Sequence, residues 1–118
     1  MWETRVTKLL GCTYPLIQGA YHGFGTAEIA TAVSNTGAFG VITAGALRTP
    51  ERVRDEIAKA RQMTDKPFGV NISLGLLPDP GAILDVVLDA GVKVVFTAAN
   101  RPEDLGHRIK QAGAVWLH

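Results

Sequence analysis

A repeated order of apolar segment, turn and amphipathic helix constrains this chain more than any single motif. The order occurs four times, and a fifth apolar segment, 114–118, follows the last helix. Short apolar strands that alternate with helices pair in parallel through right-handed crossovers. The sequence therefore predicts an α/β fold. Because no helix follows the fifth apolar segment, we expect the architecture to be incomplete.

The expected strands are apolar at nearly every position. Parallel strands that are covered on both faces have this composition, whereas half-exposed antiparallel strands alternate apolar and polar residues. We therefore expect one parallel sheet with both faces buried. The expected strands are 15–18, 39–43, 68–72, 92–97 and 114–118.

Capping residues mark where the helices begin. Thr26 and Thr49 precede amphipathic segments as N-caps, and Asp79-Pro80 repeats the arrangement of Thr49-Pro50. Glycines or a proline then end the segments. The expected helices are 4–10, 26–35, one from Pro50 to before Lys66-Pro67, one from Pro80 to before Gly91, and one from Pro102 to before Gly113.

Two architectures accommodate five parallel strands. An open doubly wound sheet is complete with five strands, whereas a TIM (β/α)₈ barrel of roughly 250 residues would be little more than half built. In both folds the functional groups lie at the carboxyl ends of the strands. Whichever fold is correct, we therefore look for functional residues at the carboxyl ends of the expected strands.

Composition excludes several classes of partner. The formal charge of the 118 residues is +1, which gives no electrostatic basis for binding nucleic acid or an anionic membrane. The chain has one cysteine, no secretory signal and no apolar run of about 18 residues. We therefore expect a cytoplasmic protein with neither a nucleic-acid nor a membrane partner.

The predicted strand ends carry small residues and amides. They hold no carboxylate, which disfavours a Mg²⁺-dependent phosphate site, and we expect no metal site. Neither a complete Gly-x-Gly-x-x-Gly nor a Gly-Lys-Ser/Thr motif is present. Small side chains let a flat ligand approach the backbone, and the amides of Gln18 and Asn71 can bind its polar edge. A flavin ring fits this set better than a metal, although both amides could instead satisfy backbone groups at strand ends.

Three segments resemble one enzyme family. YPLIQGA at 14–20, AVSNTGAFGVITAG at 32–45 and DKPFGVNI at 65–72 occur in the order and spacing typical of FMN-dependent nitronate monooxygenases. FMN-dependent enoyl-ACP reductases share the pattern. The resemblance extends over residues 5–118, and it implies that 1–118 is the N-terminal part of a single FMN-binding TIM-barrel domain. The chain would then be a parallel half-barrel, with the first four βα units and strand five.

The resemblance also implies roles for individual residues. Gln18, Gly19 and Ala20 match the loop whose backbone passes along the FMN, and Asn71 matches an asparagine that hydrogen-bonds the cofactor. His118 matches a histidine that faces the active-site cavity. The family's catalytic histidine and its FMN phosphate site belong to segments that follow strand five. Tyr21 and His22 stand where relatives often have methionine, so the substrate pocket is expected to differ.

The implied activity is oxidation of an alkyl nitronate, or of a nitroalkane after deprotonation, by O₂ to a carbonyl compound and nitrite. An enoyl-ACP reductase-like barrel is the first alternative. The second is a non-catalytic, truncated half-barrel. The first and fifth strands of this chain, 15–18 and 114–118, would both be open edges of the sheet. We therefore expect self-association through them.

Overall fold

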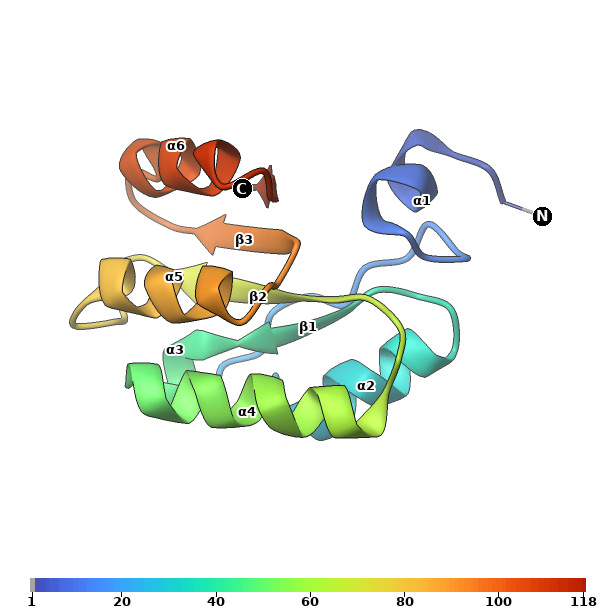
Figure 1. Ribbon diagram of the computed structural model, residues 1–118, viewed down its shortest axis with the longest axis horizontal. Coiled ribbons are helices and arrows are strands. Elements are labelled where there is room, and N and C mark those ends of the chain that lie inside the picture. The colour runs from blue at the N-terminus through green and yellow to red at the C-terminus, as the bar shows by residue number, and fades with distance from the viewer. Residues whose placement is uncertain (1) are drawn as a thin grey trace.

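The computed structural model describes residues 2–118, and its centre is a four-stranded parallel sheet (Figure 1). The strands lie in sequence order, so the sheet has no point at which the order reverses. A doubly wound sheet has such a reversal, whereas successive strands of a (β/α) barrel follow one another around it. The predicted α/β class and parallel pairing are therefore confirmed, and the strand order favours the barrel. The strands are β1 (Gly40–Thr43), β2 (Phe68–Ser73), β3 (Val94–Ala98) and β4 (Val115–Leu117).

The expected first strand, 15–18, is present only as an isolated parallel bridge between Ile17 and Phe39. Gln18 N donates to Phe39 O at 2.9 Å, and Phe39 N donates to Leu16 O at 2.8 Å. Pro15 has no N–H to extend the pairing in one direction. In the other direction the side chain of Gln18 replaces the backbone as the partner of β1, as described below. The segment still occupies the position of a first strand beside β1.

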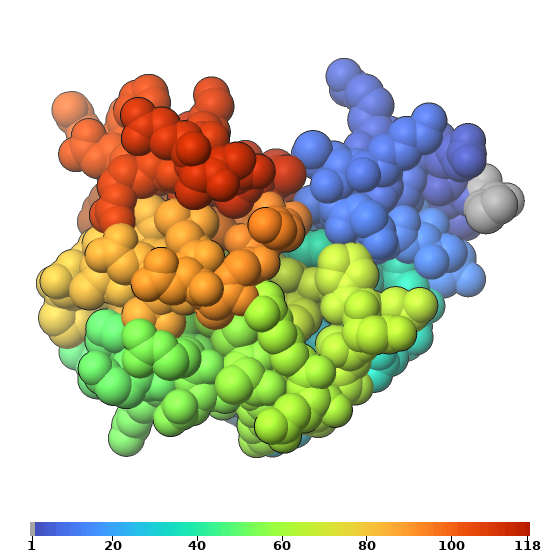
Figure 2. Space-filling model, in the orientation of Figure 1, coloured from blue at the N-terminus to red at the C-terminus, as the bar shows by residue number. Residues whose placement is uncertain are grey.

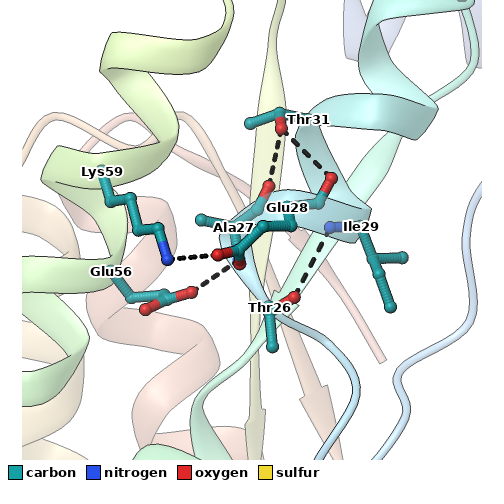
Figure 3. A network of polar contacts seen from close by, with 7 residues as sticks. All are labelled: Thr26, Ala27, Glu28, Ile29, Thr31, Glu56 and Lys59. Atoms are coloured by element: carbon teal, nitrogen blue, oxygen red, sulfur yellow. Dashed lines mark hydrogen bonds and ion pairs between the residues drawn. The ribbon is translucent and has the colours of Figure 1, made fainter.

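Six helices are found among the described residues, and they begin close to the predicted caps. Thr26, Thr49 and Asp79 each accept a hydrogen bond from the first turn of the helix that they precede. The first turn of α2 is also held by residues of α4 (Figure 3). The helices are α1 (Arg5–Leu10), α2 (Ala27–Asn35), α3 (Ala44–Leu47), α4 (Pro50–Met63), α5 (Pro80–Asp89) and α6 (Glu103–Gln111).

Helix α3 was not predicted from the sequence. It follows β1 without a connecting loop, and its N-cap residue Thr43 makes no side-chain capping bond. Arg48 ends it with a φ of 67°, a left-handed conformation usually left to glycine. A four-residue helix without a capping signal has no periodicity that a sequence can reveal.

The prediction of two buried faces is confirmed for β1 and nearly all of β2, whereas residues of β3 and all of β4 are only partly buried. One face carries the larger apolar cluster, which includes Ile42, Val70 and Val95 and is covered by α2, α4, α5 and α6 (Figure 1). We call it the outer face. The opposite, inner face carries a smaller cluster of Leu10, Phe39, Val41 and Val94, with Phe96, Val115 and Leu117 against it.

Within residues 2–118, the amino-terminal and carboxyl-terminal segments lie on the same side of the molecule. Figure 2 shows the amino-terminal segment, in blue, and α6 with the carboxyl-terminal segment, in red, along one edge of the space-filling view. Leu10 of α1 belongs to the inner cluster, whereas Ile109 of α6 belongs to the outer cluster. Among residues 2–118, no helix combines the length and apolar character needed to cross a bilayer.

Candidate functional site

The register of the sheet aligns the predicted site residues at its carboxyl end. Thr43 of β1 pairs with Asn71 of β2, and Asn71 pairs with Phe96 of β3. Side chains that are neighbours across strands share a face, and alternate residues along a strand point to the same face. Val41 and Phe96 belong to the inner cluster, so Thr43 and Asn71 also lie on the inner face.

Asn71 is 4% exposed and retains hydrogen-bonding capacity. Its Nδ2 donates to Ser73 Oγ at 3.0 Å. No residue within 2–118 donates to its Oδ1. A carboxamide oxygen can accept two hydrogen bonds, and this one is not among the fully buried side-chain atoms without a partner, so it is accessible from outside. Asn71 can therefore accept a hydrogen bond from a ligand at this end of the sheet.

Gln18 uses its side chain to complete the edge of the sheet. Its Nε2 donates to Val41 O at 3.2 Å, and Val41 N donates to its Oε1 at 3.2 Å. The carboxamide thus takes the place of a peptide group and extends the pairing of the isolated bridge. Gln18 thus satisfies backbone groups at the end of a strand, which is the structural alternative that its sequence position allows. The part that the resemblance gives it, through its backbone, stays a prediction.

The backbone after Gln18 is open. Gly19 and Ala20 are exposed, and a Cβ atom added at Gly19 would meet nothing within 4 Å. His22 lies nearby, because a Cβ atom added at Gly45 would be 3.7 Å from its Nδ1. The fold thus brings His22 from a loop to the end of β1. No pattern of residues predicts that contact.

Thr43 contributes a buried hydroxyl that has no hydrogen-bond partner among the described residues. Gly25 lies directly against it, because a Cβ atom there would be 2.0 Å from Thr43 Oγ1. Thr43 N donates to Gly25 O at 2.8 Å, which fixes the loop over the end of β1. The expected strand 39–43 ends at Thr43, but the sequence predicts no role for its side chain.

His118 does not lie beside Asn71. Its Nδ1 is 2.9 Å from Thr97 Oγ1, and Trp116 Nε1 donates to the same oxygen at 2.8 Å. Trp116 packs against the outer cluster. The structure therefore directs His118 toward Thr97 on the outer face, whereas Asn71 is on the inner face. A place for His118 in an active-site cavity stays a prediction.

The carboxyl end offers little acid–base or metal chemistry apart from its histidines. No group of three or more His, Cys, Asp or Glu within 2–118 could hold a metal ion. Cys12 precedes the first strand segment and packs against the inner cluster, and burial raises the pKa of its thiol, which works against the thiolate form that a nucleophile needs. The arrangement is suited to binding and orienting a planar ligand with a polar edge.

A cavity of about 600 Å³ lies at the opposite, amino end of the strands. Its lining includes the apolar residues Leu10, Phe68 and Val94. Functional groups of parallel α/β folds gather at the carboxyl ends of the strands, so the size of this cavity does not make it the candidate site. Its charged lining residues are Lys8, Arg61, Asp65, Lys66 and Lys93.

Comparison with known proteins identifies the family. The family model described as nitronate monooxygenase matches residues 3–83, well over half of the chain. The chain belongs to the nitronate monooxygenase family. The resemblance of the segments at 14–20, 32–45 and 65–72 is thereby confirmed.

Several curated proteins resemble this nitronate monooxygenase family member. A Mycobacterium tuberculosis (3aS,4S,5R,7aS)-5-hydroxy-7a-methyl-1-oxo-octahydro-1H-indene-4-carboxyl-CoA dehydrogenase is 34% identical over 113 residues, which are 96% of this chain and 31% of that protein. A probable nitronate monooxygenase of Staphylococcus aureus is 41% identical over 73 residues, 61% of this chain and 20% of the relative. The chain thus spans about a third or less of these relatives.

A solved structure shows the same arrangement in space. FabK from Thermotoga maritima superimposes with a TM-score of 0.93 at 37% identity, covering 98% of this chain and 37% of FabK. The fold of this nitronate monooxygenase family member is therefore a portion of a TIM barrel, as the strand order indicates. The two curated relatives are named a dehydrogenase and a probable nitronate monooxygenase.

Proposed function

We propose that this chain forms the ring-facing wall of an FMN site in an oxidoreductase that converts alkyl nitronates and O₂ to carbonyl compounds and nitrite. The observation that carries the proposal is the buried carboxamide of Asn71, whose oxygen has no donor among the described residues. It lies at the carboxyl end of the sheet, where barrel enzymes bind their ligands. Family membership supports the reaction.

The residues at this end suit a flavin ring. Asn71 can bind its polar edge, and the open backbone of Gly19 and Ala20 lets a flat surface approach closely. The flavin supplies the electron transfer between nitronate and O₂, while the protein binds, orients and excludes water. The imidazole rings of His22 and His118 add N–H hydrogen-bond donors near the same end of the sheet.

We propose that different segments of the protein bind the ring of the cofactor and its phosphate. In the family the phosphate is bound by segments that follow strand five, and residues 1–118 supply only contacts to the ring. Backbone amides and helix N-termini contribute much of the affinity for a phosphate. Residues 1–118 should therefore bind flavins weakly, and they should bind riboflavin about as well as FMN.

The test is a titration of riboflavin and of FMN with the chain, followed by flavin fluorescence. We expect saturable quenching with similar Kd values for both ligands. Asn71→Ala should weaken binding about tenfold, because the loss of one hydrogen bond in a buried site costs about 1.4 kcal/mol. Gln62→Ala is the matched control, since it removes an exposed carboxamide from α4. Equal affinities for Asn71→Ala and the unaltered chain would contradict the proposed site.

A reductase is the second candidate function. The segments at 14–20, 32–45 and 65–72 are shared with FMN-dependent enoyl-ACP reductases, and the Mycobacterium relative is named a dehydrogenase. Flavin binding by residues 1–118 does not separate the two functions. The full-length protein does: nitronate-dependent O₂ consumption supports a monooxygenase, whereas oxidation of a nicotinamide cofactor that depends on an enoyl thioester supports a reductase.

A further inference from the structure

Thr97 is the buried centre of a hydrogen-bonded group near the carboxyl end of β3, whose other members, Trp116 and His118, are half-buried and exposed. It is 2% exposed, and its Oγ1 lies 2.8 Å from Trp116 Nε1 and 2.9 Å from His118 Nδ1. Both partners come from the next strand position, β4 and the residue that follows it. One hydroxyl therefore connects an indole to an imidazole.

The direction of each hydrogen bond follows from the chemistry of the three groups. An indole N–H can only donate, so Thr97 Oγ1 accepts from Trp116. The hydroxyl has one proton of its own, and a buried donor needs an acceptor. Within residues 2–118, the only acceptor bonded to this hydroxyl is His118 Nδ1. An imidazole nitrogen that accepts a hydrogen bond carries no proton, so the proton of neutral His118 belongs on Nε2.

We infer that Thr97 is a positioning residue that holds His118 in the neutral Nε2–H tautomer. Neither the resemblance nor the comparisons assign Thr97 a role. The inference concerns the ring orientation and proton position of His118. It does not depend on the presence of a flavin.

The geometry around Thr97 is fixed from both sides. Val95 of β3 pairs with Trp116 of β4, which sets the register between the two strands. The indole lies against the backbone of α6, because a Cβ atom added at Gly106 would be 2.4 Å from Trp116 Cη2. The register and this contact hold the indole in place, with its N–H donating to Thr97 Oγ1.

The consequence is a single, oriented donor. His118 is exposed, and its Nε2–H is left to donate to a ligand oxygen at the carboxyl end of the sheet. A nitronate or carboxylate oxygen, which only accepts hydrogen bonds, would match it. This choice of ligand rests on the proposed function, whereas the tautomer does not.

Nitrogen-15 NMR of the histidine side chains of the chain tests the inference. At a pH of about 9 imidazoles are neutral, and long-range proton–nitrogen correlations show which ring nitrogen carries the proton. We expect His118 to show the Nε2–H form with no detectable Nδ1–H form. His107 is an internal reference, since it is exposed on α6. A predominant Nδ1–H form at His118 would overturn the inference.

Two variants separate positioning from a structural effect. Thr97→Val keeps the shape of the side chain but removes its proton, so the Nδ1–H form of His118 should become detectable. Thr97→Ser restores the hydroxyl and should restore the single tautomer. Trp116→Phe removes the donor to Thr97 but leaves the hydroxyl proton free for His118, so the tautomer should not change. If Thr97→Val does not fold, a mixed tautomer in Thr97→Ser or a changed one in Trp116→Phe still contradicts the inference, as does an unchanged spectrum in folded Thr97→Val.

Discussion

Glu56 Oε1 accepts a hydrogen bond from the backbone N–H of Ala27 at 2.6 Å, across 29 positions of sequence (Figure 3). Ala27 is the first residue of α2, and Glu56 lies in the middle of α4. The first N–H groups of a helix lack partners within it, and they carry partial positive charge. A carboxylate from a neighbouring helix satisfies one of them here. The contact fixes the start of α2, and with it the end of the loop at 19–26, against α4.

Glu56→Ala should lower the free energy of unfolding by about 1–2 kcal/mol, because it leaves the buried N–H of Ala27 without an acceptor. Glu56→Gln should lose less, since its amide oxygen can still accept. Urea unfolding followed by circular dichroism measures both. Asp55→Ala is the control, because Asp55 is exposed on the same helix. Equal losses for Glu56→Ala and Asp55→Ala would show that the contact contributes nothing.

Gly40→Ala should destabilise the chain by about 3 kcal/mol, at the upper end of what overpacking usually costs. A Cβ atom at Gly40 would lie 1.9 Å from the backbone oxygen of Ala30, so β1 and α2 would have to move apart. Gly19→Ala is the matched control, since a Cβ there meets nothing within 4 Å. The midpoint of thermal unfolding compares the two variants. A Gly40→Ala variant as stable as Gly19→Ala would refute the close packing of β1 on α2.

Most elements were predictable because their signals are local. The capping residues Thr26, Thr49 and Asp79 act within one turn of the helices that they begin, so composition and spacing reveal them. The close approach of Gly40 to Ala30 depends instead on packing between a strand and a helix. A glycine in an apolar strand segment does not indicate which neighbouring helix or strand will bring its backbone close to it.

The candidate site was predictable only in part for the same reason. Asn71 could be named because it lies at the end of a predicted strand, and strand ends meet in parallel folds. The pairing of Gln18 with Val41 joins residues 23 positions apart through a side chain that imitates a peptide. The contact of Thr97 with His118 requires the register between β3 and β4. Neither contact has a sequence pattern.

The ion pair between Glu28 and Lys59 should make stability depend on pH (Figure 3). The hydrogen bond from Lys59 lowers the pKa of Glu28, and Glu28 raises the pKa of Lys59. A lowered carboxyl pKa stabilises the fold above the ordinary pKa of the group, and the gain is lost as pH falls through the lowered value. A raised lysine pKa stabilises the fold below the ordinary value of that group, and the gain is lost at more alkaline pH through the raised value.

The measurement is urea unfolding of the unaltered chain and of Glu28→Gln between about pH 3 and 7, around the ordinary carboxyl pKa. The difference should be small, because both side chains are about half exposed. It should shrink as the pH falls and also when about 1 M salt screens the pair. A difference that does not change with pH or salt would mean that Glu28 acts by something other than its charge.

Thr43→Val should leave the free energy of unfolding unchanged or raise it by about 1 kcal/mol. The hydroxyl of Thr43 is buried without a partner, so its desolvation is uncompensated and a methyl group of similar shape removes that penalty. Thr31→Val is the matched control. Thr31 is also buried, but its Oγ1 donates to Ala27 O at 2.7 Å, so the same substitution should cost about 1 kcal/mol. Equal losses at the two positions would show that the Thr43 hydroxyl has a partner, and weaker flavin binding by a stable Thr43→Val variant would identify the ligand as that partner.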